Sequence, residues 1–487
     1  MSKKRWNAAR RGALGHFGWM LVLVNVAVLA KIVPESQRHC SAQGVGGTTR
    51  NADDAEASGR RATGQFGAPE EFLPRDVFRR LGLQRARGRH IDLVTDLTDR
   101  EFAADLVQSF DAAVSQWAGF LNLPEGGVDN WKVNAYVMRD ARKFRDTGLL
   151  PRSVADFPFG TARGNTLWTH DQPSDYYNRH LLLHEGVHAL MADQFGGTGP
   201  TWFMEGTAEL LSVHAGAGGQ TTVNRVPVNR ESTQAWGRFK LLSQRRDQKR
   251  IKTIKDVMRL RRKLNGDVES YGWSWAVVML LSQYPDTRSV LVEASREGRD
   301  ATSNFTRRFY SELVDEWPIL QARWKMMMLE LDYGFDWSRE VINITLDDES
   351  VSNEMLNGDF TLDVVANQGW QSSGRIFEPG TRIRIRATGE IVLAETTRPW
   401  VSLPSGITFR QARGRPIGEL LACVLPVRAE EQEFVRLPAV VPVGSECELE
   451  IVERSWLLFR VNDALGEMSD NEGSYRVNLS AVGDTSE

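Results

Sequence analysis

The stretch HLLLHEGVHALMADQF at residues 180–195 constrains the fold of this 487-residue chain more than any other. It places His184 and His188 four positions apart in a largely apolar segment, and Glu185 follows the first histidine. In an α-helix, residues four apart lie one above the other on the same face. A helical conformation would therefore direct both imidazoles to one point, with an acid beside them.

A second helix is expected directly downstream, in the sequence TWFMEGTAELLSVH that follows Pro200. The first helix should begin near Ser174, a good capping residue, and end at Gly196, because glycine commonly terminates helices. A short turn then lets the second helix pack antiparallel against the first. Glu205 would reach the two histidines, and Glu209 would lie one turn further along the same face.

These residue types predict a catalytic zinc site, in which zinc takes three protein ligands and keeps one position for water. His184, His188 and Glu205 are the predicted ligands. Glu185 is the predicted general base, which takes a proton from water that the metal has acidified. Glu209 is assigned to the other N–H of a ligating histidine, where it would fix the tautomer. Glu205 and Glu209 could exchange these two roles.

The motif HEGVH followed by WFMEGTAE resembles the gluzincin zinc metallopeptidases, both thermolysin-like and aminopeptidase-like, and their bacterial peptidase MA-like relatives. The resemblance covers about residues 88–330 and implies an α+β domain that hydrolyses peptide bonds in peptide or protein substrates. It also implies that Glu205 is the third zinc ligand and that Glu209 supports a ligand. The gap between His188 and Glu205 is slightly shorter than in the best-known members.

Peptide hydrolysis also needs a group that stabilises the oxyanion. Tyr271 is the first candidate, because in similar families a tyrosine at the start of such an apolar helix points at the zinc; the alternative is that it packs the helix start. His170, His180 and His214 are rivals. His180 shares a helix face with His184 and is interpreted as structural. His170 lies on the predicted strand TLWTH, which could be an edge for an extended substrate.

The remaining pattern before residue 340 predicts strands followed by helices, which defines an α+β unit. Strands are expected over residues 90–97, 132–140 and 165–171. Other helices are expected over residues 109–121, 233–246, 252–263, 270–283 and 302–332.

After about residue 340 the pattern changes to short alternating segments such as FTLDVVA, TRIRIRATGEIVLAE and SYRVNLSAV, which Gly, Pro, Asn and Asp interrupt. This pattern of short alternating segments predicts an antiparallel β-sandwich or barrel. The expected fold class is therefore an α+β metallopeptidase-like catalytic domain at residues 76–338, followed by an all-β accessory domain at residues 339–487.

The segment LLFRVNDALGEMSDNEGSYRVNL in this second domain places Asp463, Asp470 and Asn471 on a loop between two strands. Clustered oxygen ligands on a glycine-containing loop suit Ca²⁺. Over about residues 365–482 the sequence resembles the calcium-dependent galactophilic bacterial lectins, which implies a bound calcium ion and a carbohydrate partner. The alternative is an Asp/Asn-rich turn without metal.

The N-terminus predicts export. Residues 1–12 are basic without an acid, and the apolar run WMLVLVNVAVLA follows. Residues 1–33 are either a cleaved signal peptide or an uncleaved membrane anchor, and both place the rest of the chain outside the cytoplasm. Residues 34–75 are poor in large apolar groups, and we interpret them as a disordered linker.

Composition and charge limit the classes of molecule that the chain can bind. A net charge of −3 and a pI near 6.3 argue against a nucleic-acid binder. Of the three cysteines, Cys423 and Cys447 could pair in an oxidising compartment or stay as free thiols, and no CxxC motif is present.

Together these patterns predict an exported zinc-dependent peptidase whose peptide or protein substrates could be glycosylated. The alternative is a non-catalytic surface or carbohydrate-binding protein that retains a metal site. A metal-free helix pair with incidental charges is a third interpretation, but it would bury unpaired acids at a high cost.

Overall fold

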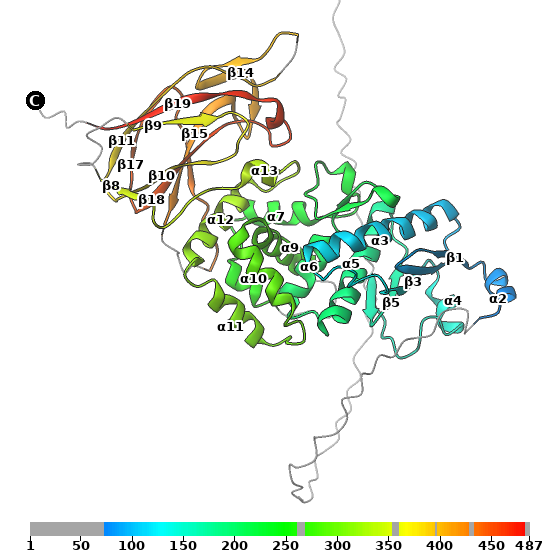
Figure 1. The fold of residues 1–487 in the computed structure, drawn as a ribbon. Helices are drawn as coiled ribbons and strands as arrows, with labels where there is room; N and C mark the ends of the chain where they lie inside the picture. The colour runs from blue at the N-terminus through cyan, green and yellow to red at the C-terminus, as the bar shows by residue number, and fades with distance from the viewer. Residues whose placement is uncertain (1–72, 261–267, 353–359, 395–396, 428–432, 483–487) are drawn as a thin grey trace, which may run out of the picture. The chain divides into compact units, whose positions relative to one another are not determined.

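The computed structural model describes residues 73–260, 268–352, 360–394, 397–427 and 433–482 (Figure 1). The chain divides into two units, Met1–Arg61 and Ala62–Glu487, and every described residue belongs to the second. The predicted signal or anchor at 1–33 therefore lies outside the described residues, as does nearly all of the predicted linker. Within the described ranges, no helix has both the length and the apolarity needed to cross a bilayer.

A five-stranded sheet forms the first part, in the order β1-β2-β3-β5-β4. Its strands are β1 (Gln84–Arg87), β2 (Ile91–Thr95), β3 (Val133–Met138), β4 (Gly160–Arg163) and β5 (Thr166–His170). The parallel strands β2, β3 and β5 correspond to the three predicted strands. The antiparallel outer strands β1 and β4 were not predicted, because they are short, half-exposed and lack apolar alternation.

Helices surround this sheet and continue beyond it (Figure 1). They are α2 (Arg75–Arg80), α3 (Arg100–Phe120), α4 (Ala141–Asp146), α5 (Asp175–Phe195), α6 (Thr201–Ser212), α7 (Arg238–Asp247), α8 (Ile254–Met258), α9 (Val268–Gln283), α10 (Pro285–Ser295), α11 (Ser303–Glu312), α12 (Trp317–Glu330) and α13 (Trp337–Glu340). A two-stranded ribbon of β6 (His214–Ala215) and β7 (Thr222–Val223) follows α6.

The helix predicted over residues 302–332 is in fact two helices, α11 and α12. Leu313 caps α11, and α12 begins at Trp317 with Pro318 in its first turn. Proline has no backbone N–H and is tolerated in a first turn but not in a helix interior, so a continuous helix cannot pass through this point. The helix α10 was not predicted at all.

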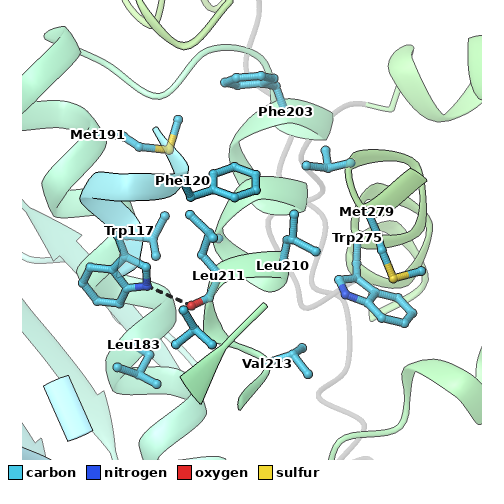
Figure 2. Close-up of a cluster of buried hydrophobic side chains, with 14 of the residues drawn as sticks. Trp117, Phe120, Leu183, Met191, Phe203, Leu210, Leu211, Val213, Trp275 and Met279 are labelled. Atoms are coloured by element: carbon cyan, nitrogen blue, oxygen red, sulfur yellow. Dashed lines mark hydrogen bonds between the residues drawn. The ribbon is translucent and has the colours of Figure 1, made fainter. Parts of the chain in front are cut away.

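The core beneath the site lies where α3, α5, α6 and α9 pack together (Figure 2). The buried Trp117 of α3 donates from Nε1 to the carbonyl of Leu211 on α6 at 2.9 Å. On the other side of α6, a Cβ on Gly206 would lie 2.5 Å from the carbonyl oxygen of Ser274 on α9. The glycine in the EGTAE segment therefore allows α6 to approach α9 closely, and this contact fixes the direction in which Glu205 and Glu209 point.

The C-terminal part is all-β and contains two six-stranded sheets. One has the order β14-β15-β18-β10-β8, with β16 beside β15, and the other has the order β13-β12-β19-β11-β17, with β9 beside β19. A shared apolar cluster fills the space between strands of the two sheets. The bounds are β8 (Glu349–Val351), β9 (Phe360–Val365), β10 (Gln371–Phe377), β11 (Arg382–Thr388), β12 (Ile391–Val392), β13 (Val401–Ser402), β14 (Ser405–Ala412), β15 (Arg415–Pro426), β16 (Ala439–Pro442), β17 (Glu446–Glu450), β18 (Ser455–Val461) and β19 (Glu472–Ala481).

Cys423 on β15 and Cys447 on β17 are both free thiols, so the disulfide that the sequence left open does not form in this structure. Cys423 is buried and its Sγ lies 3.7 Å from the sulfur of Met326 on α12, whereas Cys447 is half-buried. The two cysteines lie on strands of different sheets.

Candidate metal centre

Helix α5 presents the two histidines of HEGVH. Its N-cap is Ser174, whose Oγ accepts from the N–H of Tyr177 at 3.1 Å, and Gly196 follows its last residue, Phe195. The predicted bounds of this helix therefore agree with the structure. The Nε2 atoms of His184 and His188 lie 3.1 Å apart, as the four-residue spacing requires.

Helix α6 brings Glu205 to the same point. Its Oε2 atom lies 3.2 Å from Nε2 of His184 and 3.4 Å from Nε2 of His188. Burial alone raises the pKa of Glu205, but hydrogen bonds from His184 and His188 outweigh burial and lower that pKa to about 2. Glu205 is therefore a carboxylate at neutral pH, and its charge is available to a cation.

This donor set fits a divalent metal ion. Two imidazole nitrogens and one carboxylate oxygen converge, and the three residues together could hold a metal. Each ring has its Nε2 atom in the cluster, and the Nδ1 atoms of His184 and His188 are buried without a hydrogen-bond partner.

A cavity of about 250 Å³ opens onto this cluster. Glu185 and Tyr271 both line it, together with Gly160 of β4 and Met204 of α6. Glu185 is buried, and the ring centroid of Tyr271 lies 5.9 Å from that of His184. The predicted base and the predicted oxyanion donor therefore face the same space as the predicted ligands.

Glu209 lies behind His184, at the side away from Glu205. Its Oε1 atom is 3.7 Å from Nδ1 of His184, and its Oε2 atom is 3.5 Å from Nε2 of His180. Arg238 donates to both of its oxygens, at 2.7 Å and 3.3 Å, and Nε1 of Trp236 donates to Oε2 at 3.2 Å. The order that the sequence favoured, with Glu205 between the histidines and Glu209 behind them, agrees with these distances.

The three rival histidines lie outside this cavity. His180 is fully buried against Glu209. His214 is stacked on Tyr176 with ring centroids 4.4 Å apart, and its Nδ1 atom lies 2.9 Å from the carbonyl of Ser212. The His170 ring lies beside that of Phe157, with ring centroids 4.9 Å apart and the planes tilted by 40°.

The suggestion that the strand TLWTH is a free edge is wrong. That strand is β5, and it pairs with β3 on one side and β4 on the other. The edge next to the cavity is β4, whose residues Gly160 and Ala162 line it.

Sequence reasoning did not identify Arg238, Trp236 or Gly160 as parts of the site. Arg238, the first residue of α7, and Trp236, just before that helix, reach Glu209 from more than twenty residues downstream, and no spacing rule connects them to it. Gly160, at the start of the short strand β4, has no sequence pattern that indicates a role in the site. Only the tertiary packing of α5, α6 and β4 identifies these three residues.

In the all-β part, the structure brings together two of the three predicted calcium ligands. Asp463 follows β18 and Asn471 precedes β19; both are buried, and Nδ2 of Asn471 lies 3.1 Å from Oδ2 of Asp463. Burial raises the pKa of Asp463. Asp470 is exposed beside them in a short 3₁₀ turn, Met468–Asp470.

Comparisons with known proteins add little to this geometry. No protein-family model matches the chain, and no curated protein matches it. Among solved structures, the chain is similar to the N-terminal domain of EclA, described as a PllA-like lectin, with 16% identity over 25% of this chain and 96% of that one. The TM-score is 0.20, so this likeness carries no argument about the present chain.

Proposed function

We propose that this chain is an exported zinc-dependent peptidase with its centre at His184, His188 and Glu205. The observation that carries the proposal is the convergence of these three donor atoms within 3.4 Å of one another, in a cavity that Glu185 also lines. Two imidazoles and one carboxylate are a common protein ligand set of catalytic zinc. The pattern of residues 1–33 supports the export part of the proposal.

Bound zinc would supply Lewis acidity, which acidifies a water and polarises the peptide carbonyl. The chain supplies the rest. The Glu185 carboxylate takes a proton from the attacking water and returns it to the leaving amine. The Tyr271 hydroxyl, on the same cavity, is the donor assigned to the oxyanion.

The edge strand β4 supports an extended peptide as the substrate. The N–H of His170 on β5 donates to the carbonyl of Phe159 at 2.8 Å, and the antiparallel register then pairs Gly160 with Thr169. In such a ladder, alternate residues direct their N–H and C=O groups away from the partner strand. Gly160 and Ala162 therefore present these groups to the cavity side, where a peptide can add as a further strand.

Substitution of the base separates catalysis from metal binding. In Glu185→Gln, cleavage of a broad peptide library should fall by roughly 10²–10⁴-fold, because the proton acceptor is lost. Metal content by elemental analysis should stay unchanged. His188→Ala is the matched variant, which should lose both metal and cleavage. A native protein that carries metal but cleaves no peptide would support the alternative, a non-catalytic surface protein.

A second candidate function, calcium-dependent carbohydrate binding, is favoured by one observation in the all-β part. The Oδ1 atom of Asn471 is buried without a hydrogen-bond partner, beside the buried carboxylate of Asp463. An orphaned amide oxygen next to a carboxylate is suited to a hard cation. Ca²⁺ should then raise the melting temperature of the native protein but not of Asp463→Asn. Glycan-array binding that persists in a calcium chelator would contradict this candidate.

A further inference from the structure

A second group of potential metal ligands lies directly behind the first. His180, His184 and Glu209 each offer an atom within 4.8 Å of the others, and all three residues are buried. Both ring nitrogens of His180 lack a hydrogen-bond partner. By spacing alone, this group could hold a second ion next to the proposed zinc.

The guanidinium of Arg238 argues against an ion there. It donates to both oxygens of Glu209, at 2.7 Å and 3.3 Å, and its side chain is buried. Arginine stays protonated at every relevant pH. A divalent ion on the same carboxylate would lie a few ångströms from a buried positive charge, where screening is weak. We therefore interpret Glu209 as a support for the metal centre rather than as a ligand of a second ion. The positive charge that neutralises Glu209 is that of Arg238.

Arg238 and Glu209 act on His184 from the side of its ring that faces away from the proposed metal. Arg238 and Trp236 together fix the carboxylate of Glu209, whose Oε1 atom lies 3.7 Å from the unpartnered Nδ1 atom of His184. A carboxylate in this position favours the tautomer with hydrogen on Nδ1 and leaves the Nε2 lone pair for a metal. The other Glu209 oxygen faces His180.

Arg238 also contacts the opposite wall of the cavity. Its guanidinium carbon lies 5.6 Å from the ring centroid of Tyr271. One cation thus touches Glu209, behind the ligand His184, and Tyr271, the assigned oxyanion donor. Its removal would loosen both sides of the centre together.

The loop that delivers Arg238 is held in a strained conformation. Ala235 has a φ of 69°, a region that residues with a Cβ rarely adopt. Ser174 Oγ, the N-cap of α5, donates to the carbonyl of Gln234 at 3.0 Å and so ties this loop to the helix that carries the histidines. Strain of this kind persists only where surrounding contacts impose it.

We infer that Arg238 is a positioning residue, which acts through Glu209 to orient His184 for metal binding and through its ring contact to orient Tyr271. The inference rests on the proposed metal centre, but it concerns Arg238, a residue to which the sequence analysis assigned no role. It does not require that peptides be the substrate.

The test measures metal affinity. In Arg238→Gln, zinc should bind 10–100-fold more weakly in competition with a chromophoric chelator, which is the usual effect of losing an outer-shell partner. The visible spectrum of the Co²⁺-loaded protein should also change. Arg238→Lys should recover part of the affinity. The matched control is Arg460→Gln, which removes a buried arginine of the all-β part from the buried Glu330 on α12 and should leave zinc affinity unchanged.

A double-mutant cycle distinguishes positioning from stability. If Arg238 acts through Glu209, the effects of Arg238→Gln and Glu209→Gln on zinc affinity should be clearly non-additive. Unchanged zinc affinity and an unchanged Co²⁺ spectrum in Arg238→Gln, with only a lower melting temperature, would overturn the inference. Should Arg238→Gln not fold, the same readouts on Arg238→Lys and Glu209→Gln decide the question. Because metal binding is read directly, failure of the peptidase proposal leaves this test intact.

Discussion

Gly160 on the edge strand β4 lies so close to Glu185 that a Cβ atom built on it would come within 2.7 Å of Oε1. The backbone of Gly160 is not in the left-handed region, so an alanine is allowed there on conformational grounds. The absence of a side chain is therefore required by the proposed base alone. This contact sets the distance between the strand that a peptide would join and the carboxylate that would act on it.

Gly160→Ala should displace Glu185 and lower kcat by about 10²-fold, since an error near 1 Å in a catalytic group costs that much. Zinc content should not change, because the ligands come from α5 and α6. Gly119→Ala on α3 is the control, since nothing lies within 4 Å of its added Cβ. Steady-state kinetics with a cleaved peptide checks the prediction, and native turnover in Gly160→Ala would refute it.

Much of this centre could be predicted from local rules. The spacing of His184 and His188, the cap at Ser174 and the placement of Glu205 on the following helix all depend on helix periodicity and short turns. Each of these patterns spans only a few residues, so it can be recognised in the sequence without knowledge of the tertiary fold. The structure brings these residues together as the pattern indicates.

The remainder could not be predicted, because it depends on contacts between distant segments. The guanidinium of Arg238 reaches Glu209 from the start of α7, after a loop in which Ala235 has a positive φ, and the edge strand β4 reads GTAR, which has no strand pattern. In the all-β part, alternation predicted strands but not their order. The parallel pairing of β8 with β10 is one example.

Metal removal should destabilise the part of the chain that contains α5 and α6. A metal that binds the folded chain alone stabilises it by RT ln(1 + [L]/Kd), about 4 kcal/mol at a thousandfold excess over Kd. Adding a chelator should therefore lower the melting temperature, and adding zinc back should restore it. His188→Ala should melt at the same temperature with or without chelator. A chelator effect that survives this substitution would place the relevant metal elsewhere.

Acid should also destabilise the chain through His214. Burial lowers the pKa of His214 to about 3, from a usual value of 6.5. Below pH 6.5 the unfolded chain binds a proton at this position and the folded chain does not, so stability rises with pH between these values and is lost on acidification. The loss attributable to this one group is at most about 1.4 kcal/mol per pH unit.

His214→Asn provides the check on this pH dependence. An asparagine amide can replace the Nδ1–H donor to the Ser212 carbonyl without titrating. The free energy of unfolding in urea, measured from pH 6.5 downwards, should fall less steeply in the variant than in the native protein. Other groups whose pKa is lowered in the folded chain, among them His180 and Glu205, contribute to the slope that remains. Equal slopes in the two proteins would mean that His214 is protonated in the folded state.

Glu330 on α12 should be among the most sensitive positions for stability, because it anchors a buried charge cluster with the all-β part. It is buried, lies 2.7 Å from Nη1 of Arg460, contacts Arg413, and accepts from Nε1 of Trp370 at 2.8 Å. Burial raises the pKa of Glu330, but the charges of Arg460 and Arg413 outweigh burial and lower it. The carboxylate is therefore ionised, and it is the nearest partner of a guanidinium that solvent cannot reach.

Glu330→Gln should lower the free energy of unfolding by about 3–5 kcal/mol, because it leaves Arg460 charged and buried without its nearest anion. The double substitution Glu330→Leu with Arg460→Met should cost much less, since a buried ion pair replaced as a whole by apolar groups is often close to neutral. Urea unfolding of the two variants and the native protein measures both values. A single variant no less stable than the double one would show that Glu340, 3.8 Å from Arg460, takes over as the counterion. In that case the double variant Glu330→Gln with Glu340→Gln should show the full decrease in the free energy of unfolding.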